Sequence, residues 1–107
     1  MGFKERVIDA VKKIPKGKVM SYGQVAAAAG KPNGAREVGR ILSSIDVKPN
    51  RIPWWRVLNN KGVISIKGNW TATKELQKKL LEKDGIIVSD DYKLDIKEYG
   101  YLKTSNS

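Results

Sequence analysis

The residues best placed to do chemistry in this chain are two adjacent tryptophans, Trp54 and Trp55, which stand between Pro53 and Arg56. The chain contains no cysteine and no histidine. A thiolate nucleophile or metal ligand and an imidazole base are therefore excluded. An indole N–H can only donate a hydrogen bond, so it does not replace either group. Taken alone, the pair is more simply interpreted as ordinary core, the usual place of tryptophan in a small domain.

Charge is the second feature that points to a function. The 107 residues carry 21 Lys and Arg against 11 Asp and Glu, which gives a net charge of +10. Such a surplus suits a polyanionic partner, most often nucleic acid, although a basic surface can also be idle. We expect a single domain over residues 1–107 without metal or cofactor. Without a long apolar run or signal-peptide pattern, we expect it to be soluble and cytoplasmic.

Three helices are predicted in the first half of the chain. Apolar residues recur at helical spacing over residues 3–14. Ser21 and Gln24 form a capping box for a second helix, and Gly30 is a natural end for it. A third helix is expected to begin near Asn33. Two short helices joined by a brief turn have the outline of a helix-turn-helix.

One face of the third helix is basic. Arg36, Gly39, Arg40 and Ser43 are spaced by three and four residues, so they share a face. A glycine inside a helix costs roughly 1 kcal/mol relative to alanine. Between two arginines it would let the helix backbone approach a flat or grooved surface. The alternative is a solvated basic face, and the spacing alone does not decide between the two.

The second half of the chain predicts short hairpins around a fourth helix. Residues 56–66 suggest a hairpin that turns at 59–62, and residues 85–96 suggest another with its tip at 89–91. Between them, Thr71 or Thr73 would cap a helix that ends near Gly85. We therefore expect a mostly helical domain with short β-hairpins, a core over about residues 3–88 and a frayed C-terminal tail.

Three motifs carry a resemblance to a known family. They are Pro-Lys-Gly-Lys-Val-Met-Ser-Tyr at 15–22, Ala-Arg-Glu-Val-Gly at 35–39 and Ile-Pro-Trp-Trp-Arg-Val at 52–57. In this order and spacing they resemble the DNA-binding domain of O6-alkylguanine-DNA alkyltransferases. The resemblance is closer to the alkyltransferase-like proteins, which lack the reactive cysteine. It implies a winged helix-turn-helix-like domain of the alkyltransferase DNA-binding type, acting as a monomer.

The resemblance also implies roles for the tryptophan segment. In the enzymes a cysteine accepts the alkyl group, a histidine helps to activate it, and an acidic residue completes the relay. Trp54, Trp55 and Asp84 fall at or near these three positions, so alkyl transfer is not expected. Pro53 and Trp54 would instead line a pocket for the alkyl group. Trp55 would pack in the core, and Arg56 would hold the loop through backbone carbonyls.

Contacts with DNA follow from the same resemblance. Arg36 would enter the duplex in place of an extruded nucleotide, and Tyr22 would press on the rotating phosphate. Lys67 would contact the alkylated base, and Trp70 offers either a stacking surface or a packing contact at a helix start. The predicted minor-groove face consists of Ala35, Arg36, Gly39, Arg40 and Ser43. The stretch 43–51 is one residue longer than in the enzymes, which leaves Ser43 and Asp46 as candidates for bracing the active-site hinge.

The function implied is that of a non-enzymatic damage sensor. It would bind O6-alkylguanine in duplex DNA, flip it and mark it for nucleotide excision repair, whose damage-recognition proteins would be its partners. It would be associated with the nucleoid, or nuclear in a eukaryote. One alternative is a helix-turn-helix regulator or nucleoid protein without lesion selectivity. Another is a base-excision glycosylase, for which Asp84 is the candidate acid.

Overall fold

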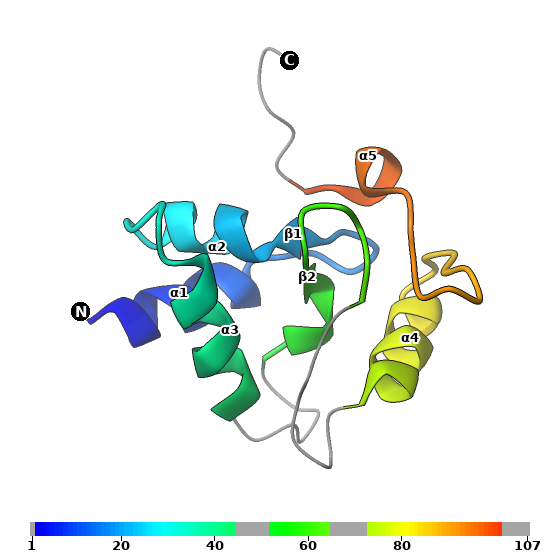
Figure 1. Ribbon diagram of the computed structural model, residues 1–107, viewed down its shortest axis with the longest axis horizontal. Helices are drawn as coiled ribbons and strands as arrows, with labels where there is room; N and C mark the ends of the chain where they lie inside the picture. Colours follow the sequence, from blue (N-terminus) through cyan, green and yellow to red (C-terminus); the bar gives the residue numbers. More distant parts are fainter. Residues whose placement is uncertain (1, 45–51, 65–72, 102–107) are drawn as a thin grey trace.

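The computed structural model describes residues 2–44, 52–64 and 73–101, and Figure 1 shows their arrangement. The elements in chain order are α1 (Phe3–Lys12), β1 (Met20–Ser21), α2 (Tyr22–Ala28), α3 (Ala35–Ser44), the 3-10 turn η1 (Trp54–Arg56), β2 (Val57–Leu58), α4 (Lys74–Lys83) and α5 (Ile96–Tyr99). Helices α1, α2 and α3 form one side of the molecule, and α4 and α5 lie on the other side of the two strands. None of the described helices is long and apolar enough to cross a membrane.

The three predicted N-terminal helices are present, and local signals fix their ends. The Ser21 hydroxyl accepts from the Gln24 backbone N–H at 3.1 Å, and the Gln24 side chain accepts from the Ser21 N–H at 2.9 Å. Gly30 follows α2 with φ at +92°, a left-handed conformation that glycine adopts without strain. Helix α3 begins at Ala35 rather than near Asn33, because the Gly34 N–H closes a turn on the Lys31 carbonyl at 2.8 Å.

The predicted hairpin over 56–66 is wrong. The turn at its tip exists, since the Gly62 N–H donates to the Asn59 carbonyl at 3.1 Å. However, β2 pairs in parallel with β1, with Met20 opposite Val57. Parallel pairing joins segments that are distant in sequence, so no local turn signal reveals it.

The second predicted hairpin is also wrong as a pair of strands. Its turn is present, because the Ser89 N–H donates to the Lys93 carbonyl at 2.8 Å. Beyond the turn, Val63 and Lys93 form an antiparallel bridge, and the Ile64 N–H reaches the Tyr92 carbonyl at 2.8 Å. The segment that follows β2, at residues 63 and 64, therefore pairs with residues 92 and 93 of the second predicted hairpin.

Helix α4 begins and ends as expected, and the chain continues its packing beyond it. The Thr73 hydroxyl accepts from the Leu76 N–H at 3.1 Å, whereas Thr71 lies outside the described residues. Downstream of residue 88, Leu94 is buried and Gly100 forms a parallel bridge with Val19. The last described residues therefore pair with the residue that precedes β1.

The two short strands separate two hydrophobic clusters. Side chains of neighbouring strand residues point to opposite faces. Accordingly, Met20 and Val57 belong to the cluster formed with α1, α2 and α3. Val19 and Leu58 belong to the cluster formed with α4 and the C-terminal segment. The turn η1 leads directly into β2, so this double core fixes the position of both tryptophans.

Candidate nucleic-acid interface

Helix α3 presents the predicted basic face to solvent. Val38 and Leu42 are buried in the first cluster, while Arg36 and Arg40 are exposed. Neither arginine has an ion-pair partner within the described chain. The acidic residue between them, Glu37, pairs instead with Lys31 at 2.6 Å. The helix therefore carries two unneutralised guanidinium groups on the side opposite its buried stripe.

Gly39 has no structural reason to be glycine in the free protein. A β-carbon built at this position meets no atom within 4 Å, and its backbone is not left-handed. Ala35 and Ser43, which share this face, are each only partly exposed, and the Ser43 hydroxyl donates to the Arg40 carbonyl at 3.0 Å. The missing side chain leaves the backbone accessible between the two arginines, as a surface that lies against a groove requires.

Tyr22 is the first residue of α2, directly after the capping serine. Its ring packs against the first hydrophobic cluster, and burial raises the pKa of its phenol above the usual 10.0. The phenol therefore stays neutral and available as a hydrogen-bond donor. The structure places it at the N-terminal end of the helix that packs on α3.

Trp54 lies inside the molecule rather than on its surface. It is 3% exposed, and Pro53 beside it is also buried. Its ring meets that of Trp55 edge to face, with 6.1 Å between centroids and 88° between planes. Within the described residues its Nε1–H has no hydrogen-bond partner. Buried donors are usually satisfied, so this N–H is a position at which an acceptor would be stabilised.

Trp55, Arg56 and Asp84 form one hydrogen-bonded group. Arg56 binds the Asp84 carboxylate with two nitrogens, Nε at 2.8 Å and Nη2 at 3.2 Å. The Trp55 Nε1–H donates to the same carboxylate at 3.0 Å. The third guanidinium nitrogen of Arg56 donates to the Ile14 carbonyl at 2.9 Å. Since Arg56 and Asp84 are only 14% and 7% exposed, this pair rigidly joins η1 to the ends of α1 and α4.

Gln77 is a site residue that we did not identify in the sequence. It is 1% exposed, and its amide nitrogen donates to the carbonyls of Trp55 and Val57, each at 3.0 Å. Helix α4 thereby holds the middle of the tryptophan turn and the first residue of β2. The available signal was its position four residues before Leu81, because a polar residue on the apolar face of a helix must bind something buried.

The remaining predicted site residues cannot be placed. Lys67, Trp70 and Asp46 lie outside the described residues. Among the residues that are described, no three Asp and Glu side chains gather where they could hold a metal ion. Asp84, the candidate acid of a glycosylase, already has both oxygens bound by Arg56.

A helix-turn-helix with an exposed basic second helix is typical of DNA-binding domains. Residues 2–86 match the family described as 6-O-methylguanine DNA methyltransferase, DNA binding domain. The chain belongs to this family, and the resemblance read from its three motifs is confirmed. Having no cysteine, it is not an alkyltransferase.

Relatives of similar length share most of the chain. A DNA base-flipping protein of Vibrio parahaemolyticus is 39% identical, covering 91% of this chain and 93% of the relative. Alkyltransferase-like protein 1 of Schizosaccharomyces pombe is also 39% identical, covering 91% and 92%. Its crystal structure in complex with damaged DNA containing O6-carboxymethylguanine superposes with a TM-score of 0.85, at 37% identity over 94% of this chain and 95% of that one.

The methyltransferases themselves are larger. The structure of the Mycobacterium tuberculosis enzyme in complex with DNA is 30% identical and superposes with a TM-score of 0.62. This similarity covers 79% of the present chain but only 49% of the enzyme. The fold therefore corresponds to the DNA-binding part of the enzyme.

Proposed function

We propose that the protein is a non-enzymatic sensor of alkylated DNA, which binds O6-alkylguanine in duplex DNA and turns it out of the helix. The observation that carries this proposal is the similarity to the S. pombe protein bound to DNA containing O6-carboxymethylguanine, which extends over nearly the whole of both chains. The missing cysteine removes the transfer step and leaves the binding steps.

Helix α3 is proposed to enter the minor groove with its arginine face. Gly39 would let the backbone approach the DNA, while Arg40 and Ser43 would contact the strands beside it. Arg36 would fill the space left by the extruded nucleotide, and Tyr22 would contact the rotated phosphate. Flipping costs a few kcal/mol, and less for a damaged base. O6-alkylation removes the N1 proton of guanine, so selectivity begins with the weakened base pair.

The extruded base is proposed to lie against the tryptophan turn. Pro53 and Trp54 would offer apolar contact to the alkyl group, on a wall held by Gln77 and by the Arg56–Asp84 pair. Lys67 would contact the base from the following loop, and Trp70 would either stack or pack at the start of α4. The site would then bind the alkylated base without reacting with it.

The bound lesion is proposed to mark DNA for nucleotide excision repair. The partners would be damage-recognition proteins of that pathway, and the protein would work as a monomer on the nucleoid, or in the nucleus of a eukaryote. A sensor that does not react with the lesion needs a repair pathway to follow it, because binding alone leaves the alkyl group on the base.

The test compares two duplexes of one sequence at matched salt, one carrying O6-methylguanine and the other guanine. Matched salt matters because phosphate contacts otherwise mask selectivity. We expect tighter binding to the damaged duplex and unchanged masses of both protein and DNA. Equal binding would favour the regulator or nucleoid protein. A lost base or a heavier protein would overturn the proposal.

A further inference from the structure

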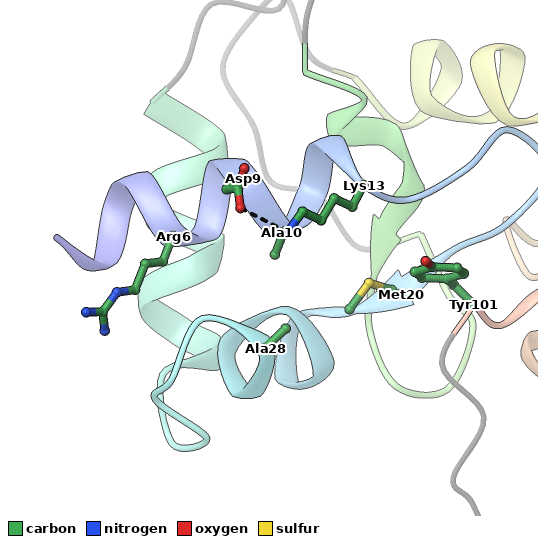
Figure 2. A pocket seen from close by; sticks show the side chains of 7 residues that line it. All are labelled: Arg6, Asp9, Ala10, Lys13, Met20, Ala28 and Tyr101. Atoms are coloured by element: carbon green, nitrogen blue, oxygen red, sulfur yellow. Dashed lines mark ion pairs between the residues drawn. The ribbon is translucent and has the colours of Figure 1, made fainter. Parts of the chain in front are cut away.

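A hollow lies away from the described residues that we assign to DNA. It is a pocket of about 270 Å³ between α1 and α2, at the point where Tyr101 approaches β1 (Figure 2). No residue of α3 or of η1 lines it, and neither does Tyr22. None of the described residues that we assign to DNA therefore covers it. Its volume is below the ~300–1,000 Å³ of most small-molecule sites, so it suits one side chain rather than a cofactor.

The walls of this pocket are apolar and shallow. Ala10 of α1 and Ala28 of α2 face each other across it, and Met20 lies at one end (Figure 2). Two alanines leave room between helices that a larger residue would fill. Met20 is only 2% exposed, so it forms the floor of the pocket as part of the first hydrophobic cluster.

The rim of the pocket combines cations with an exposed aromatic ring. Arg6 and Lys13 are two helical turns apart on one side of α1, about 10 Å along its axis. Lys13 pairs with Asp9 at 3.3 Å, an exposed pair that an incoming carboxylate can exchange. Arg6 has no ion-pair partner within the described part of the chain.

Tyr101 supplies the aromatic part of the rim at the end opposite Arg6 (Figure 2). At 42% it is one of two large hydrophobic residues exposed among those described. Its backbone N–H donates to the Val19 carbonyl at 2.8 Å, which holds its main chain beside the pocket. Tyrosine and arginine are enriched in protein–protein interfaces and contribute much of their binding energy.

We propose that this pocket docks an acidic segment of a partner protein. One large apolar side chain of the segment would enter between Ala10 and Ala28, and carboxylates on either side of it would pair with Arg6 and Lys13. The net charge of +10 would steer an acidic partner toward the protein. DNA fits the pocket less well, because a phosphate backbone has no apolar group for the walls.

The proposal does not depend on lesion selectivity, and its test is designed accordingly. The isotope-labelled protein is first saturated with unmodified duplex DNA, so that α3 is occupied. An acidic nonapeptide of glutamate and aspartate with a central phenylalanine is then titrated, and backbone amide shifts are recorded by NMR. We expect saturable shifts at Ala10, Ala28 and Tyr101, and at least tenfold weaker binding when alanine replaces the phenylalanine.

Two variants of equal charge change separate this site from general electrostatics. Arg6→Glu should weaken peptide binding at least tenfold, while Lys79→Glu on the exposed side of α4 should change it less than twofold. Both should retain their binding to DNA. Ala28→Arg, which fills the pocket without removing a positive charge, should also abolish the shifts.

Four results would overturn the proposal. They are peptide binding that DNA displaces, equal binding of the phenylalanine and alanine peptides, and equal losses in the two glutamate variants. The fourth is a shift of the pocket amides with protein concentration alone, which would identify a second copy of the chain as the occupant.

Discussion

Replacing Gly39 with alanine should separate the stability of the fold from its function. Nothing lies within 4 Å of the added β-carbon, and the backbone of Gly39 is not among the left-handed glycines. Alanine inside a helix is favoured over glycine by roughly 0.5–1 kcal/mol. For a domain of about 100 residues, 1 kcal/mol corresponds to about 4 °C in Tm. We therefore expect Gly39→Ala to unfold at higher urea concentration and higher temperature than the parent protein.

The same methyl group should weaken DNA binding. It would project between Arg36 and Arg40, on the face that we place in the groove. Forcing an extra carbon into a close contact costs roughly 1–3 kcal/mol. We therefore expect about tenfold weaker affinity, since 1.4 kcal/mol corresponds to a factor of about ten. Fluorescence anisotropy with damaged and undamaged duplexes measures this loss, and urea unfolding followed by fluorescence measures the gain in stability.

Gly85→Ala is the matched control. Its β-carbon would also meet no atom within 4 Å, but its φ is +93°. A left-handed conformation costs alanine roughly 1–2 kcal/mol, so this variant should lose stability and keep its DNA affinity. A more stable Gly39→Ala protein with parental DNA affinity would refute the placement of Gly39 against the groove. A less stable one would refute our account of α3.

Four further predictions concern the site. Arg36→Ala should lose lesion preference more than affinity for undamaged duplex in competition binding; equal losses would make Arg36 a phosphate contact only. Asp84→Ala should lower the free energy of unfolding by about 3–5 kcal/mol, because it leaves the Arg56 guanidinium buried without its partner; a loss below about 1 kcal/mol in urea unfolding would contradict this reading. Trp54→Cys should gain no methyl group from O6-methylguanine duplex by mass spectrometry, and efficient uptake would show that the histidine position is dispensable. Burial raises the pKa of Tyr22 above 10.0, so the folded state keeps a proton that the unfolded state releases. Stability should therefore fall as pH rises above about 10, and Tyr22→Phe should reduce that slope in unfolding measurements, whereas an identical slope would assign the effect to other groups.

Local signals predicted the helices, but they did not predict the strands. The capping box of Ser21 and Gln24 and the final glycine of α2 act within one turn of the chain, so the sequence displays them directly. β1 and β2 have two residues each, too few for an alternating pattern. Their parallel pairing is decided by which faces fill the two hydrophobic clusters, and that depends on the whole fold.

The site residues also divide into those that local spacing predicts and those whose contacts depend on the whole fold. The exposure of Arg36 and Arg40 follows from helical spacing, and the structure confirms it. The link between Arg56 and Asp84 joins the tryptophan turn to the end of α4, and no spacing rule connects positions 28 residues apart. Gln77 was missed for a related reason, because its partners are backbone carbonyls, which carry no signature in the sequence.

Asp84 holds the tryptophan turn in place through its bonds to Trp55 and Arg56. By the family resemblance, this acid would orient a histidine that activates the acceptor cysteine. Imidazole can donate to an acid and accept from a thiol at once, whereas indole can only donate. The N–H of Trp55 donates to Asp84, and the indole has no acceptor atom that could take a proton from residue 54. Arg56 neutralises the carboxylate. Contacts that would carry a proton in an enzyme here fix the ring of Trp55, against which the buried Trp54 ring packs edge to face, and we therefore expect no transfer even if a thiol were restored.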